Sequence, residues 1–191
     1  MPMRQRPRRH ARGVRALCAT WPDYSAEGFD VVLFTRSLHH IERLGEAVEK
    51  ASSAVKPGGR IMVEDFAFHE ADHNTVCWFR ALLEQLHDQQ RLAVDESSFA
   101  SRILRATDPI GAWHHGSDHI HPALQQHTAL RDYFRIDHVA AAPYLYRYLA
   151  PLLREPTPES LDAIVAEECR AAALGQLTLI GRRYVGTRVA T

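Results

Sequence analysis

The sequence has no long apolar run, no net charge and only three cysteines among its 191 residues. A membrane-spanning helix needs about 18–20 consecutive apolar residues, so we expect no membrane partner. Basic and acidic residues number 23 each, and this balance gives no overall field that would select nucleic acid. The cysteines at positions 18, 77 and 169 match no metal or redox spacing, which predicts a reducing, cytoplasmic location.

What the sequence does contain suits one globular domain, because 46% of its residues are hydrophobic and 24% are charged, without repeats or linkers. Residues 1–13 carry five arginines and almost nothing apolar. No aromatic residues lie between these arginines to stack on nucleic-acid bases. We therefore expect residues 1–13 to be a basic, disordered leader and residues 14–191 to form the domain.

The middle of the chain predicts a strand, a helix and a second strand. FDVVLFT at 29–35 is almost continuously apolar, as in a strand buried on both faces. Apolar residues then recur at helical spacing from Ile41 to Val55, which predicts an amphipathic helix of about four turns. Pro57 and two glycines end it, and RIMVEDF at 60–66 follows as a strand. This order predicts a right-handed βαβ unit in a parallel sheet.

Beyond the second strand the pattern becomes more helical and more polar. Asp72 is expected to cap a helix with an apolar stripe. Residues 94–128 are polar and rich in histidine, which predicts a loop, so that a lid-like insertion spans about residues 69–131. A last helix is expected between Thr157 and Gly175. Three further strands are expected at residues 14–19, 133–141 and 177–185.

Polar residues follow both strands of the βαβ unit, and ligands bind outside the carboxyl ends of strands in such sheets. His39 and His40 come just after the first strand. Either suits a general base for a hydroxyl or an amine, since histidine has a reference pKa of about 6.5. Alternatively, one caps the helix start and the other packs. Asp65, at the end of the second strand, is expected either to orient a substrate amine or to cap the next turn.

A second histidine cluster, HHGSDHIH at 114–121, contains residue types that bind zinc. The alternative is a solvated loop, because no ligand outside this segment is identifiable, and we assign no metal site. Tyr144 belongs to an alternating row of tyrosines that either edges a substrate cavity or belongs to the core and its rim.

The motifs around the βαβ unit resemble a known family. FDVVLFTRSLHHI, a helix, and then VKPGGRIMVEDF are similar to the second half of a class I S-adenosylmethionine-dependent methyltransferase. In that family the fourth strand ends in a short polar segment and often LHH. The fifth strand is introduced by L-x-P-G-G and ends in an acidic residue. The resemblance implies a Rossmann-like α/β sheet with flanking helices and methyl transfer from S-adenosylmethionine to a small-molecule acceptor.

The resemblance also implies roles for individual residues. His39 would line the cavity between cofactor and acceptor and His40 would pack at the helix start, because His39 is nearer the strand end. Asp65 and Tyr144 would face the acceptor. At the Thr20 position the family usually has an aspartate for the adenine amino group. The residues expected to contact the cofactor are Thr20, Trp21, Thr35, Arg36, Ser37 and Leu38.

Other family motifs are missing from the sequence. The family's glycine-rich loop and its ribose-binding acid would lie before residue 14, where nothing resembles them, and the ten glycines include no G-x-G. The resemblance thus implies an N-terminally incomplete sheet, impaired catalysis, and an exposed edge at strand 29–35 that pairs with itself or with residues 14–19. The alternatives are a non-catalytic binding module that uses this edge, and a metal-dependent hydrolase built on residues 114–121.

Overall fold

The computed structural model describes residues 8–11, 14–16, 20–21, 24, 26–93, 95–115 and 119–189. Its largest sheet has the strand order β3-β4-β6-β5. β3 and β4 run parallel, whereas β6 is antiparallel to both β4 and β5. The predicted α/β fold with a parallel βαβ unit is therefore confirmed, and β5 and β6 add two antiparallel strands to it. The strands are β3 (Phe29–Thr35), β4 (Val55–Phe66), β5 (Phe134–Ala142) and β6 (Gly181–Arg188).

The βαβ unit forms from the predicted local signals. α1 (Leu44–Ala54) links β3 to β4, and the short 3₁₀ turn η1 (Leu38–His40) precedes it. β4 begins earlier than predicted, with a register shift opposite β3 between Phe29 and Val31. Gly59 lies at this irregularity, where an added Cβ would come within 2.9 Å of the Asp30 carbonyl oxygen. Only glycine permits so close an approach of the two strands.

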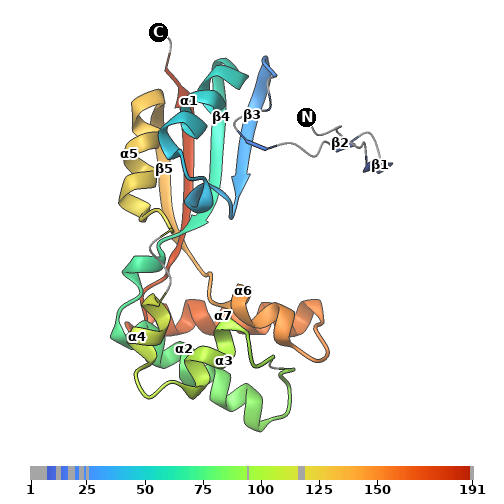
Figure 1. Ribbon diagram of the computed structural model, residues 1–191, viewed down its shortest axis with the longest axis vertical. Coiled ribbons are helices and arrows are strands. Elements are labelled where there is room, and N and C mark those ends of the chain that lie inside the picture. The colour runs from blue at the N-terminus through green and yellow to red at the C-terminus, as the bar shows by residue number, and fades with distance from the viewer. Residues whose placement is uncertain are drawn as a thin grey trace.

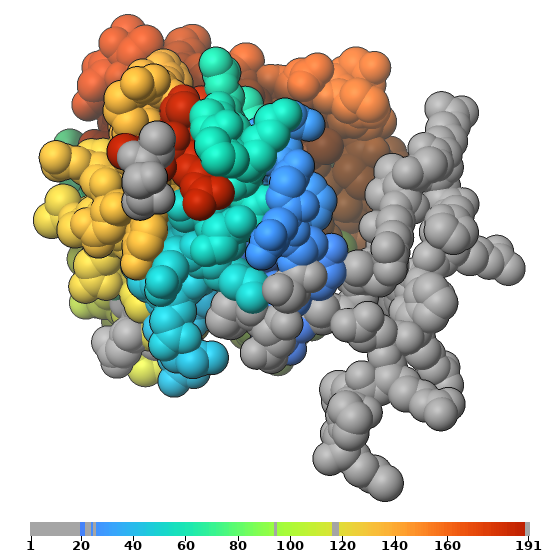
Figure 2. Space-filling model, turned by 90° about the horizontal axis from the view of Figure 1, so that it is seen from above, coloured from blue at the N-terminus to red at the C-terminus, as the bar shows by residue number. Residues whose placement is uncertain are grey.

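Helices cover one face of the sheet. α1 and α5 (Ala123–Tyr133) pack on it around a core that includes Phe34, Ile61 and Leu130. In Figure 2, β3 in blue and α5 with β5 in yellow to orange lie on opposite sides of the teal α1 and β4. On the opposite face Leu33 is 60% exposed and is paired in register with Met62, which is 39% exposed.

The other helices form a second part of the molecule with a core of its own, at the opposite end of the long axis (Figure 1). Asp72 and Thr157 cap α2 and α7, as predicted. Gly175 follows α7 with a φ of +70°. The helices of this part are α2 (His73–Asp88), α3 (Phe99–Arg105), α4 (Pro109–His114), α6 (Tyr146–Leu149) and α7 (Pro158–Ala173), with the 3₁₀ turns η2 (Phe68–Glu70) and η3 (Ala150–Leu152).

Three differences from the sequence prediction concern this part. Residues 94–128 were predicted as a loop, yet α3, α4 and the start of α5 lie there. α5 packs on the sheet rather than in a lid. By contrast, α6 and α7, which follow β5 in the chain, share a hydrophobic core with α2, α3 and α4. β6 begins later than expected because Leu177 and Ile180 are buried in the helical core. None of the described helices is long and apolar enough to cross a membrane.

The amino-terminal strands do not join the large sheet. β1 (Arg8–Ala11) and β2 (Val14–Ala16) pair with each other in a separate antiparallel sheet. Residues 8–11 thus form a strand where a disordered leader was expected, and the rest of that leader lies outside the described residues. The strand expected at 14–19 is seen at 14–16, but it does not pair with β3. Within the described part of the chain, β4 is the only strand neighbour of β3.

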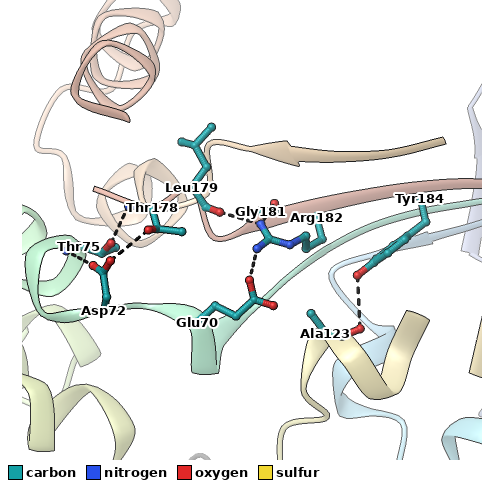
Figure 3. A network of polar contacts seen from close by, with 9 residues as sticks. All are labelled: Glu70, Asp72, Thr75, Ala123, Thr178, Leu179, Gly181, Arg182 and Tyr184. Carbon is teal, nitrogen blue, oxygen red and sulfur yellow. Dashed lines mark hydrogen bonds and ion pairs between the residues drawn. The ribbon is translucent and has the colours of Figure 1, made fainter. Parts of the chain in front are cut away.

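Polar contacts tie the two parts together where the chain passes between them (Figure 3). Arg182 of β6 pairs with Glu70 and donates to the carbonyl oxygen of Leu179 at 2.7 Å. Asp72 accepts hydrogen bonds from the Thr75 N–H and from the Thr178 hydroxyl, at 2.8 and 3.1 Å. The start of α2 is therefore fixed to the segment that leads into β6.

Candidate functional site

The carboxyl ends of β3 and β4 point toward the helical part (Figure 1). Asp65 lies there and is fully buried, with 0% exposure. Its Oδ2 accepts the His39 N–H at 3.1 Å, while its Oδ1 accepts the Phe66 N–H at 3.0 Å and pairs with His39 Nδ1. A buried carboxylate is stable only when its oxygens accept hydrogen bonds. Asp65 therefore contacts His39 and its own strand end, whereas the sequence analysis expected it either to orient a substrate amine or to cap the next turn.

His39 is held in one orientation by this carboxylate. Its ring meets the edge of Phe66 at 88° with centroids 4.5 Å apart, and only 3% of the residue is exposed. Nδ1 faces Asp65, whereas Nε2 has no hydrogen-bond partner among the described residues. Nε2 is also not among the described polar atoms that are both fully buried and without a partner. The Nε2 edge therefore keeps some access to the surface.

His40 is the exposed member of the pair, although the sequence analysis expected it to pack at the helix start. Its ring stacks on His119 with centroids 5.6 Å apart and lies 3.9 Å from that of His39. Partial desolvation lowers the pKa of His40, and positive charge on His39 or His119 lowers it further. His40 therefore stays neutral to a lower pH than an isolated histidine.

The histidine-rich loop packs against the LHH turn. The His121 N–H donates to the His39 carbonyl oxygen at 3.0 Å, and His121 Nε2 lies 3.0 Å from the Ile41 carbonyl oxygen. Among the described residues, which exclude 116–118, no three His, Cys, Asp or Glu side chains converge as metal ligands would. The sequence analysis considered this segment as a metal site or as a solvated loop, and it missed the contact with His39.

Four of the expected cofactor contacts lie at the end of β3 or directly after it. Thr35 and Arg36 are exposed and Ser37 is half-buried, but Leu38 is fully buried in the sheet core. Leu38 therefore offers no surface to a cofactor, contrary to the prediction. Arg36 has a φ of +53°, and its N–H donates to the Glu64 carbonyl oxygen at 2.7 Å. Such a backbone conformation is unfavourable for a residue other than glycine and is concentrated at functional sites.

The remaining expected cofactor contacts precede β3. The Trp21 indole N–H donates to the Ala47 carbonyl oxygen at 3.1 Å, and its ring meets Phe34 at 88° with centroids 5.6 Å apart. Trp21 is thus attached to α1 and β3 and is half-buried, while Thr20 is exposed. The indole N–H is already used within the protein, which leaves the ring surface for contact with a ligand.

Tyr144 lies beside the Asp65–His39 pair. Its ring stacks on Phe66 with centroids 4.5 Å apart and planes within 4°, and it is 6% exposed. Burial is the main cause that raises the pKa of Tyr144 to about 12, so its hydroxyl stays protonated. Glu168 of α7 accepts the Tyr144 N–H at 2.7 Å and fixes its position. The sequence did not indicate Phe66 or Glu168 as parts of this site.

Comparisons with known proteins agree with the family indicated by the motifs. Residues 2–63, less than half of the chain, match the family described as "Methyltransferase domain". The search of curated proteins returned no match.

Similar solved structures include the N-methyltransferase NodS from Bradyrhizobium japonicum in complex with S-adenosyl-L-homocysteine, at 11% identity and a TM-score of 0.37. That match covers 88% of this chain and 50% of NodS. Another is phosphoethanolamine N-methyltransferase 2 of Haemonchus contortus in complex with S-adenosyl-L-methionine, at 12% identity and a TM-score of 0.42, covering 88% and 35% of the two chains.

The chain thus spans half or less of each of these structures, and likenesses at these scores carry no argument about activity. The family match includes β3 and most of β4 up to Val63. It confirms the resemblance of this chain to the class I S-adenosylmethionine-dependent methyltransferases.

Proposed function

We propose that this protein transfers a methyl group from S-adenosylmethionine to a small-molecule acceptor, with His39 as the general base. The observation that carries the proposal is the buried Asp65–His39 pair at the carboxyl ends of β3 and β4, with Nε2 facing away from the carboxylate. The family match supports the reaction class. S-adenosylmethionine would supply an electrophilic methyl group, and the side chains would position the acceptor and remove its proton.

The described residues fit part of the cofactor. At the end of β3, Thr35 and Arg36 would pass their backbone groups near the methionine part of the cofactor, with Ser37 half-buried beside them. Thr20 with the Trp21 ring offers a second surface. The unfavourable backbone of Arg36 is the observation that favours a ligand at this strand end. These residues would hold the methionine and adenine parts, and none of them is an acid that would bind ribose hydroxyls.

Asp65 has two tasks in this proposal. By accepting a hydrogen bond from His39 Nδ1–H, it leaves Nε2 as the unprotonated nitrogen that takes up a proton from the acceptor's O–H or N–H. It then stabilises the imidazolium that results. Phe66 and Tyr144 form an aromatic wall that excludes water from this side of the ring. His40, with its lowered pKa, is the second candidate for the base.

The test measures S-adenosylhomocysteine release with a panel of small hydroxyl and amine acceptors. A positioned base contributes about 10²–10⁴-fold, so His39→Ala should lower kcat by at least the lower figure. His87→Ala, on the exposed end of α2, is the matched control and should keep the wild-type rate. Equal rates for His39→Ala and wild type would remove the base from the proposal, and release by no acceptor in the panel would oppose methyl transfer itself.

His39→Gln guards against misfolding in this test. Its amide can still donate to Asp65, but it cannot take up a proton, so the variant should fold and remain slow. If His40→Ala loses activity while His39→Gln does not, the base is His40.

We further propose that two copies of the protein associate through the edge of β3, as in the alternative of a binding module that uses this edge. β3 exposes Phe29, Val31 and Leu33 on one face and has no second strand neighbour in the described residues. Such edges pair with other strands. Val32 packs against the sheet core and is unsuitable for a test, so we choose Leu33→Lys.

Sedimentation analysis should show a wild-type oligomer that Leu33→Lys converts to monomer. Leu124→Lys, a control on α5 that is 73% exposed, should leave the oligomer intact. A wild type that stays monomeric at high concentration would exclude this interface.

A further inference from the structure

An arginine cluster lies at the carboxyl ends of β3 and β4, next to the Asp65–His39 pair. Arg183 Nε donates to Glu64 Oε2 at 3.1 Å, and Arg147 pairs with Glu64 Oε1. The Arg36 N–H donates to the Glu64 carbonyl oxygen, and its side chain is exposed. The Glu64 carboxylate therefore pairs with two guanidinium groups, and the exposed Arg36 side chain belongs to the neighbouring strand end. Asp65, the other acid close by, is sealed against His39.

The cluster has more donors than Glu64 can satisfy. Each guanidinium has five N–H groups, and Glu64 accepts from one nitrogen of Arg147 and one of Arg183. Arg147 Nε is buried without a partner in the described part of the chain, which is rare for a buried polar atom. The guanidinium of Arg147 is held over the rings of Tyr144 and Tyr146, 5.4 and 5.1 Å from their centroids.

Two aromatic contacts connect the cluster to the proposed base. The Phe66 ring stacks on Tyr144 and also meets the edge of His39. Arg147 lies over the Tyr144 ring and also pairs with Glu64, so the cluster adjoins this aromatic contact. A ligand anion bound by the arginines would place the rest of a small molecule near His39.

We propose that this cluster binds the carboxylate or phosphate of the methyl acceptor, so that the substrates are small acids with a hydroxyl or amine nucleophile. Arg36, Arg147 and Arg183 supply the planar, bidentate donors that suit both anions. The assignment to the acceptor rests on the proposed methyl transfer, whereas anion binding itself does not. The same chemistry would suit the carboxylate of the cofactor's methionine part, and the experiment separates the two.

The first arm titrates the protein with inorganic phosphate in a calorimeter, at ionic strength held constant with chloride. The double variant Arg36→Gln/Arg183→Gln removes two exposed guanidinium groups and keeps the Arg36 backbone. We expect it to raise the Kd by about tenfold or more. Arg135→Gln, in an exposed ion pair on β5, is the matched control and should bind like wild type. No binding to wild type, or equal loss in the control, would overturn the site.

The second arm titrates the same variants with S-adenosylhomocysteine. An unchanged affinity in the double variant would support the acceptor's anion as the ligand. A loss as large as that for phosphate would assign the cluster to the cofactor and overturn the acceptor proposal. If wild type binds phosphate but no S-adenosylhomocysteine, the methyl-transfer proposal fails while the anion site stands. Urea unfolding of each variant shows that a loss of binding is not a loss of folding.

Discussion

Replacing Asp65 by asparagine tests whether the buried carboxylate holds His39 in place. In the native protein Oδ1 accepts the Phe66 N–H and pairs with His39 Nδ1, while Oδ2 accepts the His39 N–H at 3.1 Å. Asparagine keeps one oxygen and puts an NH₂ group where the other stood. In either orientation of the amide, at least one buried N–H then loses its acceptor and faces another donor.

The size of the effect follows from these contacts. A hydrogen bond to a charged group stabilises a protein by about 1.5–3 kcal/mol, and breaking a buried charged pair costs about 3–5 kcal/mol. Because asparagine retains one acceptor oxygen, we expect the free energy of unfolding to fall by about 2–4 kcal/mol. For a chain of this length each kcal/mol lowers Tm by about 2–4 °C, so Tm should fall by about 4–16 °C.

Urea and thermal unfolding followed by circular dichroism measure both quantities. Asp30→Asn is the control, because Asp30 pairs with Lys56 in solvent, where water and salt screen the interaction. It should leave the free energy of unfolding nearly unchanged. If Asp65→Asn is as stable as this control, the carboxylate does not hold His39 and the proposed base has no fixed orientation. His39→Ala combined with Asp65→Asn should cost less than the two single changes added, because they remove one shared interaction.

Three further predictions test other parts of the structure. Burial raises the pKa of Glu168 above its ordinary value, so its folded form binds a proton more tightly than its unfolded form, and the free energy of unfolding should fall as the pH rises above 4.5. Glu168→Gln should flatten this dependence of the free energy of unfolding on pH, measured by urea titrations at several pH values. An unaltered slope would count against a raised pKa of Glu168. Gly59→Ala places a Cβ 2.6 Å from Val55 Cγ1 and should lower the free energy of unfolding, measured with urea, by about 1–3 kcal/mol. The control Gly45→Ala has open space around the new Cβ and should lower it by nothing. Equal stability of the two variants would refute the clash. Calorimetry should find weak S-adenosylhomocysteine binding, because Leu38 is buried and none of the residues expected to contact the cofactor is an acid that would bind the ribose hydroxyls. A low-micromolar Kd, about −8 kcal/mol, would contradict this.

The sequence predicted the elements whose signals are local. The apolar run of β3, the helical spacing of α1 and the KPGG turn determine the βαβ unit within 38 residues, 29–66. The caps at Asp72 and Thr157 act on N–H groups three residues away. Such interactions depend little on the rest of the fold, so composition and spacing identify them.

The helices of residues 94–128 were missed although they also carry local signals. Ser98 and Asp108 accept the N–H groups of Ser101 and Gly111 as N-caps, and Pro109 stands at the first turn of α4. These helices are short, so their stability comes from packing rather than from periodicity. Trp113 of α4 is fully buried and donates to the Phe68 carbonyl oxygen at 3.1 Å, a contact between distant segments that no local pattern reveals.

Within the site, the sequence located the residues but not their orientation. It placed His39 and Asp65 at neighbouring strand ends, and the structure brings them into contact. Which histidine turns inward depends on the 3₁₀ turn η1, which buries Leu38 and His39 and exposes His40. The contact between Glu64 and Arg147 spans 83 positions along the chain, and only the packing of the helical part against the sheet brings them together.

That packing makes the site dependent on a residue that contacts neither the proposed base nor the arginine cluster. Glu168 accepts the backbone N–H groups of Tyr144, Leu145 and Tyr146 at 2.7, 3.0 and 3.2 Å. These hydrogen bonds fix the segment that places Tyr144 on Phe66 and brings Arg147 to Glu64. Because the three N–H groups have this single side chain as their acceptor, loss of Glu168 would move the aromatic wall and one arginine together. We therefore expect the proposed anion binding and the position of the proposed base to depend on Glu168 of α7, which acts through the backbone rather than through contact with the ligand.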